Sequence, residues 1–382
     1  MPDITYLDFA ATSAVRPPEV VRAVTHYLEH IGATPGRGAH RLAVEAGRVA
    51  LRCRQRIAEL LGIEGDVGRI AFMANATYAL NTALWGCVRR KERIVVTAFD
   101  HNATLRPAAA LAHERDVEVV LVPVSAEGAF DEAELLRALD GARVLCINAA
   151  SNVLGTVLDV SRLAHLARSA GALTVVDVAQ LAGHVPFRVS DWNVDMVAFT
   201  GHKGMLGPQG IGGLWVRPGV DLVPLLRGGT GGDSRLREMP AVLPDQLEAG
   251  TVNAPGIAGL DAGVEYVLRH GVAQIHERLD GLKRNLWVGL SEMADVRVHS
   301  PLTAWGIPIV TITSRTIDAA TLAARLDREF GVLVRAGLHC APEAHRVMGT
   351  IDTGAVRFSL GWCSTAEDVE CALQGVRAIV RS

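Results

Sequence analysis

The chain has 382 residues, of which 49% are apolar and 21% charged, and its formal net charge is −3. A chain of this length can bury a large core and is expected to form two or more structural lobes. Because the net charge is small and no lysine and arginine block occurs, neither nucleic acid nor an anionic membrane is an expected partner.

No targeting or membrane-spanning signal is found in the sequence. Met1-Pro2-Asp3-Ile4 is not a basic region followed by an apolar core, and no uninterrupted apolar run approaches the roughly 20 residues needed to span a bilayer. Six widely spread cysteines without a Cys-x-x-Cys pair argue against a zinc knuckle or a disulfide framework. We therefore expect a cytoplasmic protein without a metal site.

Helix and strand patterns alternate from about residue 76 to residue 216. In chain order, the sequence predicts a helix over 76–90, strands over 93–97 and 118–122, a helix over 131–139, a strand over 144–148, a helix over 159–170, and strands over 174–177 and 194–199. This alternation predicts an α/β fold whose mostly parallel sheet carries helices on both faces. Cys53, Cys87 and Cys371 fall in helical patterns and Cys146 in a strand pattern, so structural roles are predicted for all four.

The remainder of the chain is predicted to form a second lobe. Helical segments occur over 254–293, followed by strands over 307–312, 332–335 and 355–360 and helices over 321–329 and 365–380. We place the domain boundary near residue 260, so that residues 21–260 form a large domain and residues 261–382 a small C-terminal one.

A lysine stands in a polar turn directly after the strand predicted over 194–199. The turn reads Thr200-Gly201-His202-Lys203-Gly204. A lysine beside a hydroxyl, an imidazole and two glycines can form a Schiff base with an aldehyde cofactor, while its neighbours approach a phosphate. The alternative is that Lys203, like most lysines, is a solvated surface charge.

A carboxylate, Asp177, ends the β-branched strand that comes before this one. The carboxyl ends of strands are where open α/β sheets bind ligands, although an acid there can also be an ordinary helix N-cap. Paired with a protonated pyridine nitrogen, the carboxylate would make a cofactor ring an electron sink. A strand ending in Asp177, followed by a strand ending near Lys203, therefore predicts a pyridoxal phosphate enzyme.

These residues belong to an ordered set of motifs that resembles a known family. The chain resembles the class V aminotransferase fold of the cysteine desulfurase and selenocysteine lyase group, and is group II-like. The motifs are Tyr6-Leu7-Asp8-Phe9-Ala10-Ala11-Thr12, Asn75-Ala76-Thr77, Asp100-His101-Asn102, Ser151-Asn152-Val153-Leu154-Gly155-Thr156, Asp177-Val178-Ala179-Gln180, Thr200-Gly201-His202-Lys203, Glu248-Ala249-Gly250-Thr251, Arg335-Ala336-Gly337-Leu338-His339-Cys340 and Val356-Arg357-Phe358-Ser359-Leu360-Gly361. They cover nearly the whole chain.

The resemblance implies a fold and a cofactor. The fold is the PLP-dependent transferase fold type I, with a seven-stranded, mostly parallel sheet flanked by helices in the large domain and a smaller α+β C-terminal domain. The N-terminal segment, residues 1–20, is expected to pack on the small domain. The cofactor is pyridoxal 5'-phosphate.

The phosphate of this cofactor is expected at the start of a helix. Ala76 and Thr77 precede the helix predicted from Tyr78, so backbone N–H groups and the helix dipole would meet the phosphate; the alternative for Thr77 is an ordinary helix cap. By resemblance, the further phosphate contacts are Thr200, His202 and Thr251, the last from the neighbouring subunit. A homodimer with shared active sites is therefore implied.

Roles at the cofactor ring and the substrate also follow from the resemblance. His101 is expected to stack on the ring and relay protons, and the amides of Asn152 and Gln180 to hydrogen-bond the phenolic oxygen. Arg357 is expected to bind the substrate α-carboxylate together with Asn152. Local sequence alone also fits a surface histidine, a turn asparagine and a solvated edge-strand arginine.

Cys340 is implied to be the persulfide-forming residue of the family, with His339 able to hold or protonate its thiolate. In the reaction so implied, L-cysteine displaces Lys203 from the cofactor aldehyde and Lys203 moves the Cα proton. Cys340 then takes the sulfur as a persulfide, alanine is left, and a partner protein accepts the sulfur. The alternative for Cys340 is a packed cysteine without a catalytic role.

Three departures from the family pattern lie beside the predicted site: Tyr78 and Asp100 where relatives often carry Glu, and Trp362-Cys363. They bear on substrate choice more than on cofactor binding. Because the fold also hosts C–S lyases and aminotransferases, in which Cys340 would not be catalytic, these activities and a non-enzymatic scaffold remain alternatives. The sequence leaves open the choice between cysteine, selenocysteine and another amino acid.

Overall fold

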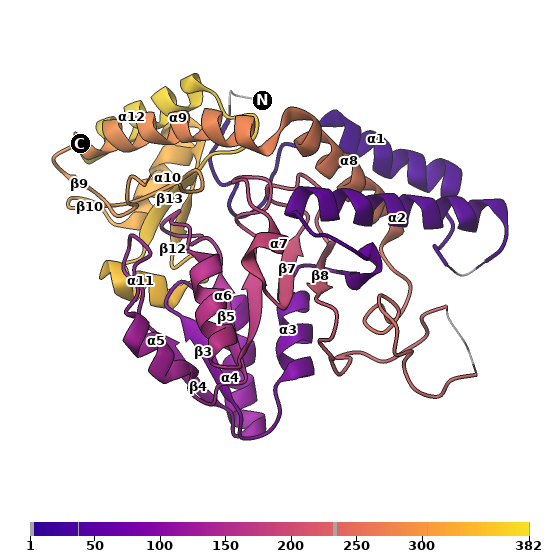
Figure 1. The fold of residues 1–382 in the computed structure, drawn as a ribbon. Coiled ribbons are helices and arrows are strands. Elements are labelled where there is room, and N and C mark those ends of the chain that lie inside the picture. The colour runs from indigo at the N-terminus through magenta and orange to yellow at the C-terminus, as the bar shows by residue number, and fades with distance from the viewer. Residues whose placement is uncertain (1–3, 37, 232–234, 304, 382) are drawn as a thin grey trace.

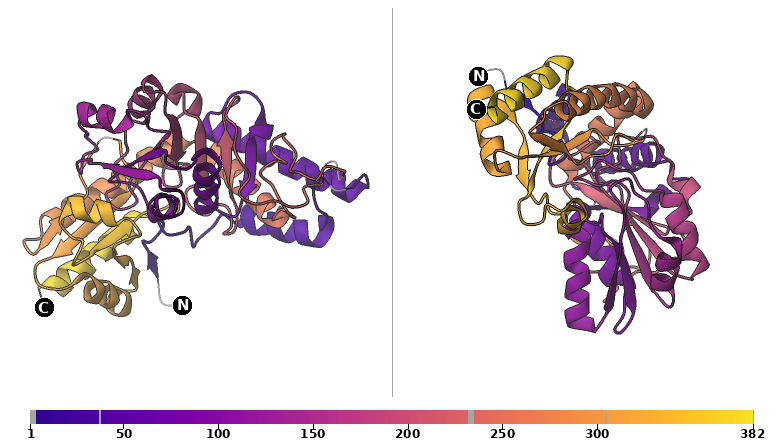
Figure 2. Two further views of the ribbon diagram at one scale, coloured as in Figure 1. Left: turned by 90° about the horizontal axis from the view of Figure 1, so that it is seen from below. Right: turned by 90° about the vertical axis from the view of Figure 1, so that its left-hand side faces the viewer.

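A computed structural model of the protein describes residues 4–36, 38–231, 235–303 and 305–381. The chain folds into a large part built around a seven-stranded sheet and a smaller part built around a four-stranded sheet (Figure 1). Both ends of the described chain lie beside the smaller part, as the two further views show (Figure 2). Residues 1–3 of the predicted N-terminal segment lie outside the described residues.

The central sheet has the strand order β2-β8-β7-β6-β5-β3-β4. Only β8 runs antiparallel to its neighbours, so the predicted mostly parallel sheet is confirmed. The strands are β2 (Ile70–Met73), β3 (Arg93–Thr97), β4 (Glu118–Val122), β5 (Val144–Asn148), β6 (Leu173–Asp177), β7 (Met196–Thr200) and β8 (Gly212–Val216). Every residue of β5 and β7 is buried, as expected for strands covered on both faces.

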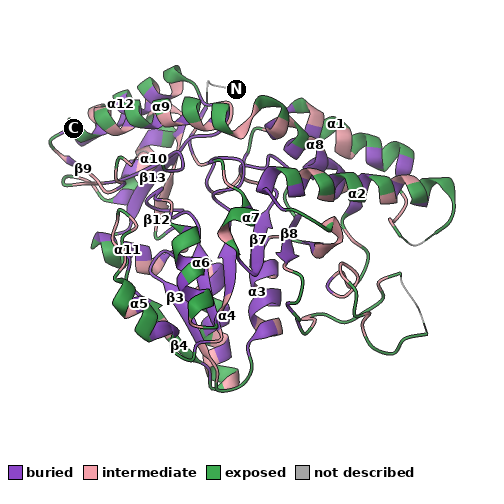
Figure 3. Cartoon of the chain, in the orientation of Figure 1, coloured by how far each residue is buried: buried purple, intermediate pink, exposed green. Residues whose placement is uncertain are grey.

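Helices cover the sheet, and their outer faces are exposed (Figure 3). Those of the larger part are α1 (Pro18–His26), the π-helix η1 (Tyr27–Ile31), α2 (Arg41–Leu61), the short 3-10 helix η2 (Val67–Arg69), α3 (Ala76–Cys87), α4 (Asn102–Arg115), α5 (Glu132–Leu139), α6 (Val160–Ser169) and α7 (Val189–Trp192). The helix predicted over 76–90 ends at Cys87, because Val88 adopts an extended backbone conformation and its carbonyl accepts a hydrogen bond from the Arg115 side chain. Asp131 and Asp159 are N-caps rather than first helical residues.

The smaller part contains an antiparallel sheet in the order β12-β13-β10-β9. Its strands are β9 (Val296–Val298), β10 (Ile309–Ser314), β12 (Arg335–Gly337) and β13 (Ala355–Ser359), and its helices are α9 (Val272–Ser291), α10 (Ala319–Phe330), α11 (Pro342–Met348) and α12 (Ala366–Val380). The strand predicted over 332–335 is two strands. Its first half, β11 (Val332–Leu333), pairs with β1 (Thr5–Tyr6), whereas β12 pairs with β13.

Two connections join the parts. The N-terminal segment pairs with the smaller part through β1, and Asp8 forms a further bridge to Ser359. The helix α8 (Ala254–His270) packs on α1 and α2 and continues through residue 260 to Gly271, whose positive φ of 79° separates it from α9. Among the described residues, no helix is long and apolar enough to span a bilayer, and no cluster of three or more acidic, histidine or cysteine side chains could hold a metal ion.

Candidate active site

One cavity of about 270 Å³ lies where the carboxyl edge of the central sheet meets the smaller part. Asn148, Asp177 and Thr200, which end β5, β6 and β7, contribute to its wall. The predicted site residues in the wall are Ala76, Thr77, His101, Asn152, Asp177, Gln180, Thr200, His202, Lys203 and Arg357. Residues far apart in the sequence are thus brought to one site.

Lys203 lies in the turn after β7 and is half-buried in the cavity wall. The Ser13 hydroxyl donates to its carbonyl at 3.0 Å, and a Cβ on Gly204 would lie 2.3 Å from the Ala182 carbonyl, so only glycine fits beside it. Burial lowers the pKa of Lys203 to about 8, although the nearby Asp177 carboxylate opposes this shift. A solvated surface lysine is therefore the wrong interpretation.

Asp177 is buried at the end of β6 and does not cap a helix, because a turn follows it. Its Oδ1 accepts a hydrogen bond from the Ala179 N–H at 2.8 Å. Burial raises the pKa of Asp177, whereas this hydrogen bond and the Lys203 ammonium lower it. The carboxylate and the lysine amine thus face the same cavity from neighbouring strands.

The helix α3 points its N-terminus at the cavity. Its N-cap is Asn75, whose side chain accepts a hydrogen bond from the Tyr78 N–H at 3.0 Å, so the threonine cap considered for Thr77 is wrong. Ala76 and Thr77 are the first two helical residues, and their N–H groups have no partner within the helix. This N-terminus suits a phosphate. Sequence reasoning missed Asn75 although asparagine is a favoured N-cap.

Two neutral histidines flank the cavity. His101 is the N-cap of α4, and its Nδ1 accepts from the Ala103 N–H at 3.0 Å, so the ring proton lies on Nε2. His202 Nδ1 lies 3.1 Å from the Thr12 hydroxyl. Burial, with a smaller contribution from the Lys203 charge, lowers the pKa of each histidine to about 4. Neither ring therefore carries charge at neutral pH.

Several polar atoms in the cavity wall are buried without a hydrogen-bond partner. They are Asn152 Oδ1, Gln180 Oε1, Thr200 Oγ1 and Arg357 Nε. The amide nitrogens are engaged, since Asn152 Nδ2 donates to the His339 carbonyl at 2.7 Å and Gln180 Nε2 to the Ala10 carbonyl at 2.9 Å. Unpaired buried polar atoms are costly, so this wall fits a polar ligand with several hydrogen-bonding groups.

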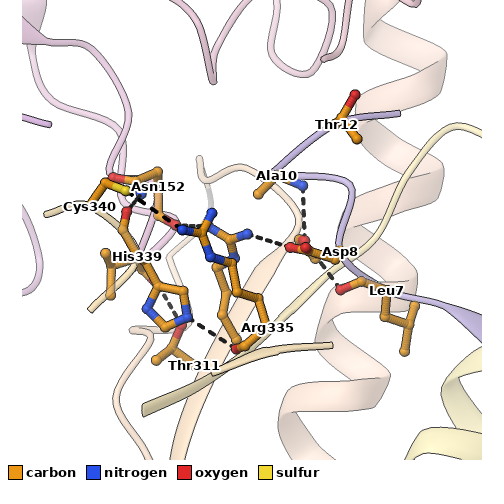
Figure 4. Close-up of polar contacts among 12 residues, drawn as sticks. Leu7, Asp8, Ala10, Thr12, Asn152, Thr311, Arg335, His339 and Cys340 are labelled. Atoms are coloured by element: carbon orange, nitrogen blue, oxygen red, sulfur yellow. Dashed lines mark hydrogen bonds and ion pairs between the residues drawn. The ribbon is translucent and has the colours of Figure 1, made fainter. Parts of the chain in front are cut away.

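Arg357 is fully buried on β13, which lies between β12 and β10, so a solvated edge-strand arginine is the wrong interpretation. Its Nη1 donates to the Asn152 carbonyl at 3.0 Å, and its Nη2 is 2.5 Å from Asp8 Oδ1. Figure 4 shows Asp8 approaching from the N-terminal segment. Sequence reasoning assigned no role to Asp8, which is separated from Arg357 by 349 positions.

Cys340 lies in the turn after β12, outside the cavity wall but beside two residues that line it, Arg335 and His339. It is half-exposed, unlike the buried Cys53, Cys87 and Cys146. The Arg335 guanidinium is 3.6 Å from the Cys340 sulfur (Figure 4). Arg335 thus places a positive charge beside a thiol at the rim of the cavity, a role that sequence reasoning did not assign.

The structure corrects one expectation for the site, and it places Thr251 away from the cavity of its own subunit. Both ring nitrogens of His339 have other partners, the His345 ring and the Arg335 carbonyl, so His339 is not placed to hold or protonate the Cys340 thiolate. Thr251, which the resemblance assigns to the site of the neighbouring subunit, borders a separate hollow of its own subunit together with Tyr78.

Known proteins resemble this chain in sequence and fold. Residues 5–371 match the protein family Aminotransferase class-V. A probable cysteine desulfurase of Methanothermobacter thermautotrophicus is 34% identical over 96% of this chain and 92% of that protein, and one of Pseudomonas putida is 35% identical over 96% and 91%. The apo structure of a cysteine desulfurase from Thermococcus onnurineus matches with a TM-score of 0.92 and 31% identity, over 99% of this chain and 95% of that chain.

Proposed function

Because this chain belongs to the class V aminotransferase family, we propose that it is a pyridoxal phosphate-dependent cysteine desulfurase that converts L-cysteine to L-alanine. The observation that carries the proposal is one cavity holding Lys203 and Asp177, with a half-exposed cysteine, Cys340, beside an arginine at its rim. Full-length relatives described as cysteine desulfurases support the same activity.

The residues of the cavity fit pyridoxal phosphate. The N-terminus of α3, with Thr200 and His202, would hold the phosphate, and Asp177 would pair with the pyridine nitrogen. Asn152 and Gln180 would meet the phenolic oxygen, and Lys203 would bind the aldehyde covalently. When bound, the cofactor withdraws electrons from the substrate Cα.

The protein groups then have distinct tasks. Arg357 binds the substrate carboxylate and the Lys203 amine moves the Cα proton. The Cys340 thiolate attacks the substrate sulfur, so that an S–S bond forms while the Cβ–S bond breaks. The electron pair of the broken bond stays with the substrate carbon, which takes up a proton and leaves as alanine. A thiol-bearing acceptor protein would remove the persulfide sulfur.

The lowered pKa of Lys203 makes a pH prediction for cofactor attachment. Only the neutral amine is a nucleophile, so the rate of covalent attachment of pyridoxal phosphate to the apoprotein should rise about tenfold per pH unit and level off near the Lys203 pKa of about 8. The growth of the visible absorption band measures this rate. A free lysine derivative is the control, and a protein rate that keeps rising to pH 10, as the control does, contradicts the prediction.

The same shift affects the stability of the apoprotein. Since the folded-state pKa of Lys203 is lowered from 10.5 to about 8, the unfolded chain binds more protons within that window. The contribution of Lys203 to the free energy of unfolding therefore increases with pH from about 8 to about 10.5 and is smallest below pH 8.

The proposed function is tested by identifying the products formed from L-cysteine. We expect the purified holoenzyme with L-cysteine and a reductant to form alanine and sulfide in equal amounts. Pyruvate and ammonia would indicate the C–S lyase alternative, in which Cys340 has no role, and transfer of the amino group to a keto acid would indicate an aminotransferase. The same assay with selenocysteine determines which of the two substrates is preferred.

Three further features remain proposals for this chain: a homodimer in which Thr251 of one subunit completes the site of the other, a separate sulfur-acceptor protein, and a cytoplasmic location. Sedimentation of the holoenzyme tests the first. Mixed dimers of an active subunit and a Lys203-variant subunit test whether sites are shared. Because only one subunit of such a dimer is active, sharing predicts that a Thr251 substitution in the inactive subunit alters the activity.

A further inference from the structure

A buried chain of hydrogen bonds lies behind the Cys340 turn. Thr350 Oγ1 is 2.8 Å from His345 Nδ1, and His345 Nε2 is 3.1 Å from His339 Nδ1. His339 Nε2 is in turn 3.1 Å from the Arg335 carbonyl oxygen. His345 and His339 are 0% and 2% exposed, so these side chains have no solvent to replace a lost partner.

The direction of donation along this chain follows from its last member. A carbonyl oxygen can only accept, so His339 donates its Nε2 proton to Arg335 and its Nδ1 must accept. His345 Nε2 is then the donor to His339, and the Thr350 hydroxyl donates to His345 Nδ1. Burial lowers the pKa of His339 to about 3 and that of His345 to about 4, so both rings stay neutral and keep this order.

In this chain of hydrogen bonds both ring nitrogens of His339 are engaged, so neither is available to the neighbouring Cys340 thiol. The group that reaches the Cys340 sulfur is instead the Arg335 guanidinium, at 3.6 Å. Figure 4 shows the His339 ring directed toward the Arg335 backbone, whereas the Cys340 sulfur lies on the side of the arginine head group. Arg335, and not His339, is therefore the side chain in contact with the sulfur.

The backbone that presents this sulfur is held in a rare conformation. His339 and Cys340 have φ values of 51° and 58°, so two consecutive residues other than glycine are left-handed. Residues outside the turn hydrogen-bond to both carbonyls: Asn152 Nδ2 donates to the His339 carbonyl, and the Asn102 N–H donates to the Cys340 carbonyl. The hydrogen bonds from Thr350 through His345 hold the same turn at the His339 side chain.

We propose that Thr350, His345 and His339 together position the sulfur-accepting turn, holding residues 339–340 left-handed and the Cys340 sulfur beside the Arg335 guanidinium. His339 is a structural link in this arrangement, and Thr350 and His345 act on Cys340 only through it. The inference rests on the proposed function, because the role of Cys340 as sulfur acceptor belongs to that proposal.

The test compares Thr350→Val, which removes the hydroxyl donor with little change of shape, with Thr350→Ser, which retains it. Two rates are measured in the holoenzyme: persulfide formation on Cys340 in a single turnover with L-cysteine, and exchange of the substrate α-proton in D2O. The second rate needs Lys203 but not Cys340. We expect Thr350→Val to slow persulfide formation about tenfold, equivalent to about 1.4 kcal/mol, with unchanged exchange and with Thr350→Ser close to wild type.

His345→Leu, which removes both ring nitrogens, should give at least the same selective loss. Equal losses of exchange and persulfide formation would show general damage, and unchanged persulfide formation in both Thr350→Val and His345→Leu would show no positioning role. Either outcome overturns the proposal.

A failure of the proposed function is recognised separately, because wild type would then exchange the α-proton without forming a persulfide. Alkylation of Cys340 by iodoacetamide in the absence of substrate, followed by mass spectrometry, still tests whether Thr350, His345 and His339 position the turn. The rate should fall in Thr350→Val and stay at the wild-type value in Thr350→Ser. Equal or faster alkylation in Thr350→Val overturns the inference.

Discussion

Lys203→Ala is expected to abolish the visible absorption band of the cofactor-bound protein and to lower desulfuration of L-cysteine by about 10³-fold or more. The substitution removes both the amine that binds the aldehyde and the base that moves the Cα proton. Neighbouring groups cannot replace the covalent attachment, because His101, His202 and Asp177 carry no primary amine.

The control for this prediction is Lys91→Gln, which changes an exposed lysine at the opposite end of the sheet, before β3. It should retain the absorption band and the activity. Borohydride reduction followed by peptide mapping identifies the modified lysine in wild type. Cofactor found on a lysine other than 203, or activity retained in Lys203→Ala, would contradict the assignment.

Cys340→Ala is expected to remove persulfide formation and to lower alanine production from L-cysteine by about 10²-fold or more, while α-proton exchange in D2O continues at the wild-type rate. The reason is that Lys203 and Cys340 occupy separate places: the lysine lies in the cavity wall, whereas the thiol lies at its rim beside Arg335. Removing the sulfur therefore leaves the proton-transfer machinery intact.

Cys363→Ala is the matched control, because Cys363 is also half-exposed but lies on the turn before α12, outside the cavity wall. Mass spectrometry of the protein after one turnover should find one added sulfur in wild type and in Cys363→Ala and none in Cys340→Ala. Unchanged alanine production in Cys340→Ala would mean that Cys340 does not accept the sulfur, and would favour the lyase alternative.

Elements could be predicted from the sequence where the apolar pattern of one short segment is enough to identify them. The apolar runs that became β5, β6 and β7 ended close to their predicted positions, so Asp177 and Lys203 could be placed at one edge of the sheet. Helix starts were harder to place. Asn75 and Thr77 are both suitable caps two positions apart, and local propensity does not decide between them.

The strand predicted over 332–335 illustrates what local pattern omits. Val332, Leu333 and Arg335 lie in strands, as predicted, but β11 pairs with β1 and β12 pairs with β13. Hydrophobic periodicity reports which face of a strand is buried and not which strand lies beside it, so the change of partner at Val334 left no signal in the sequence.

By itself, the sequence predicted the alternating α/β elements and the positions of Lys203 and Asp177 at one edge of the sheet, and its resemblance to a family led to the proposals of the cofactor and of the role of Cys340. Only the tertiary structure decided that Asp8 pairs with Arg357, that Arg335 rather than His339 faces the Cys340 sulfur, and that Asn152 and His339 share a hydrogen bond across 187 positions. The physical reason is that a repeating pattern of burial specifies one element at a time, whereas these contacts arise from packing the two sheets and the N-terminal segment against one another.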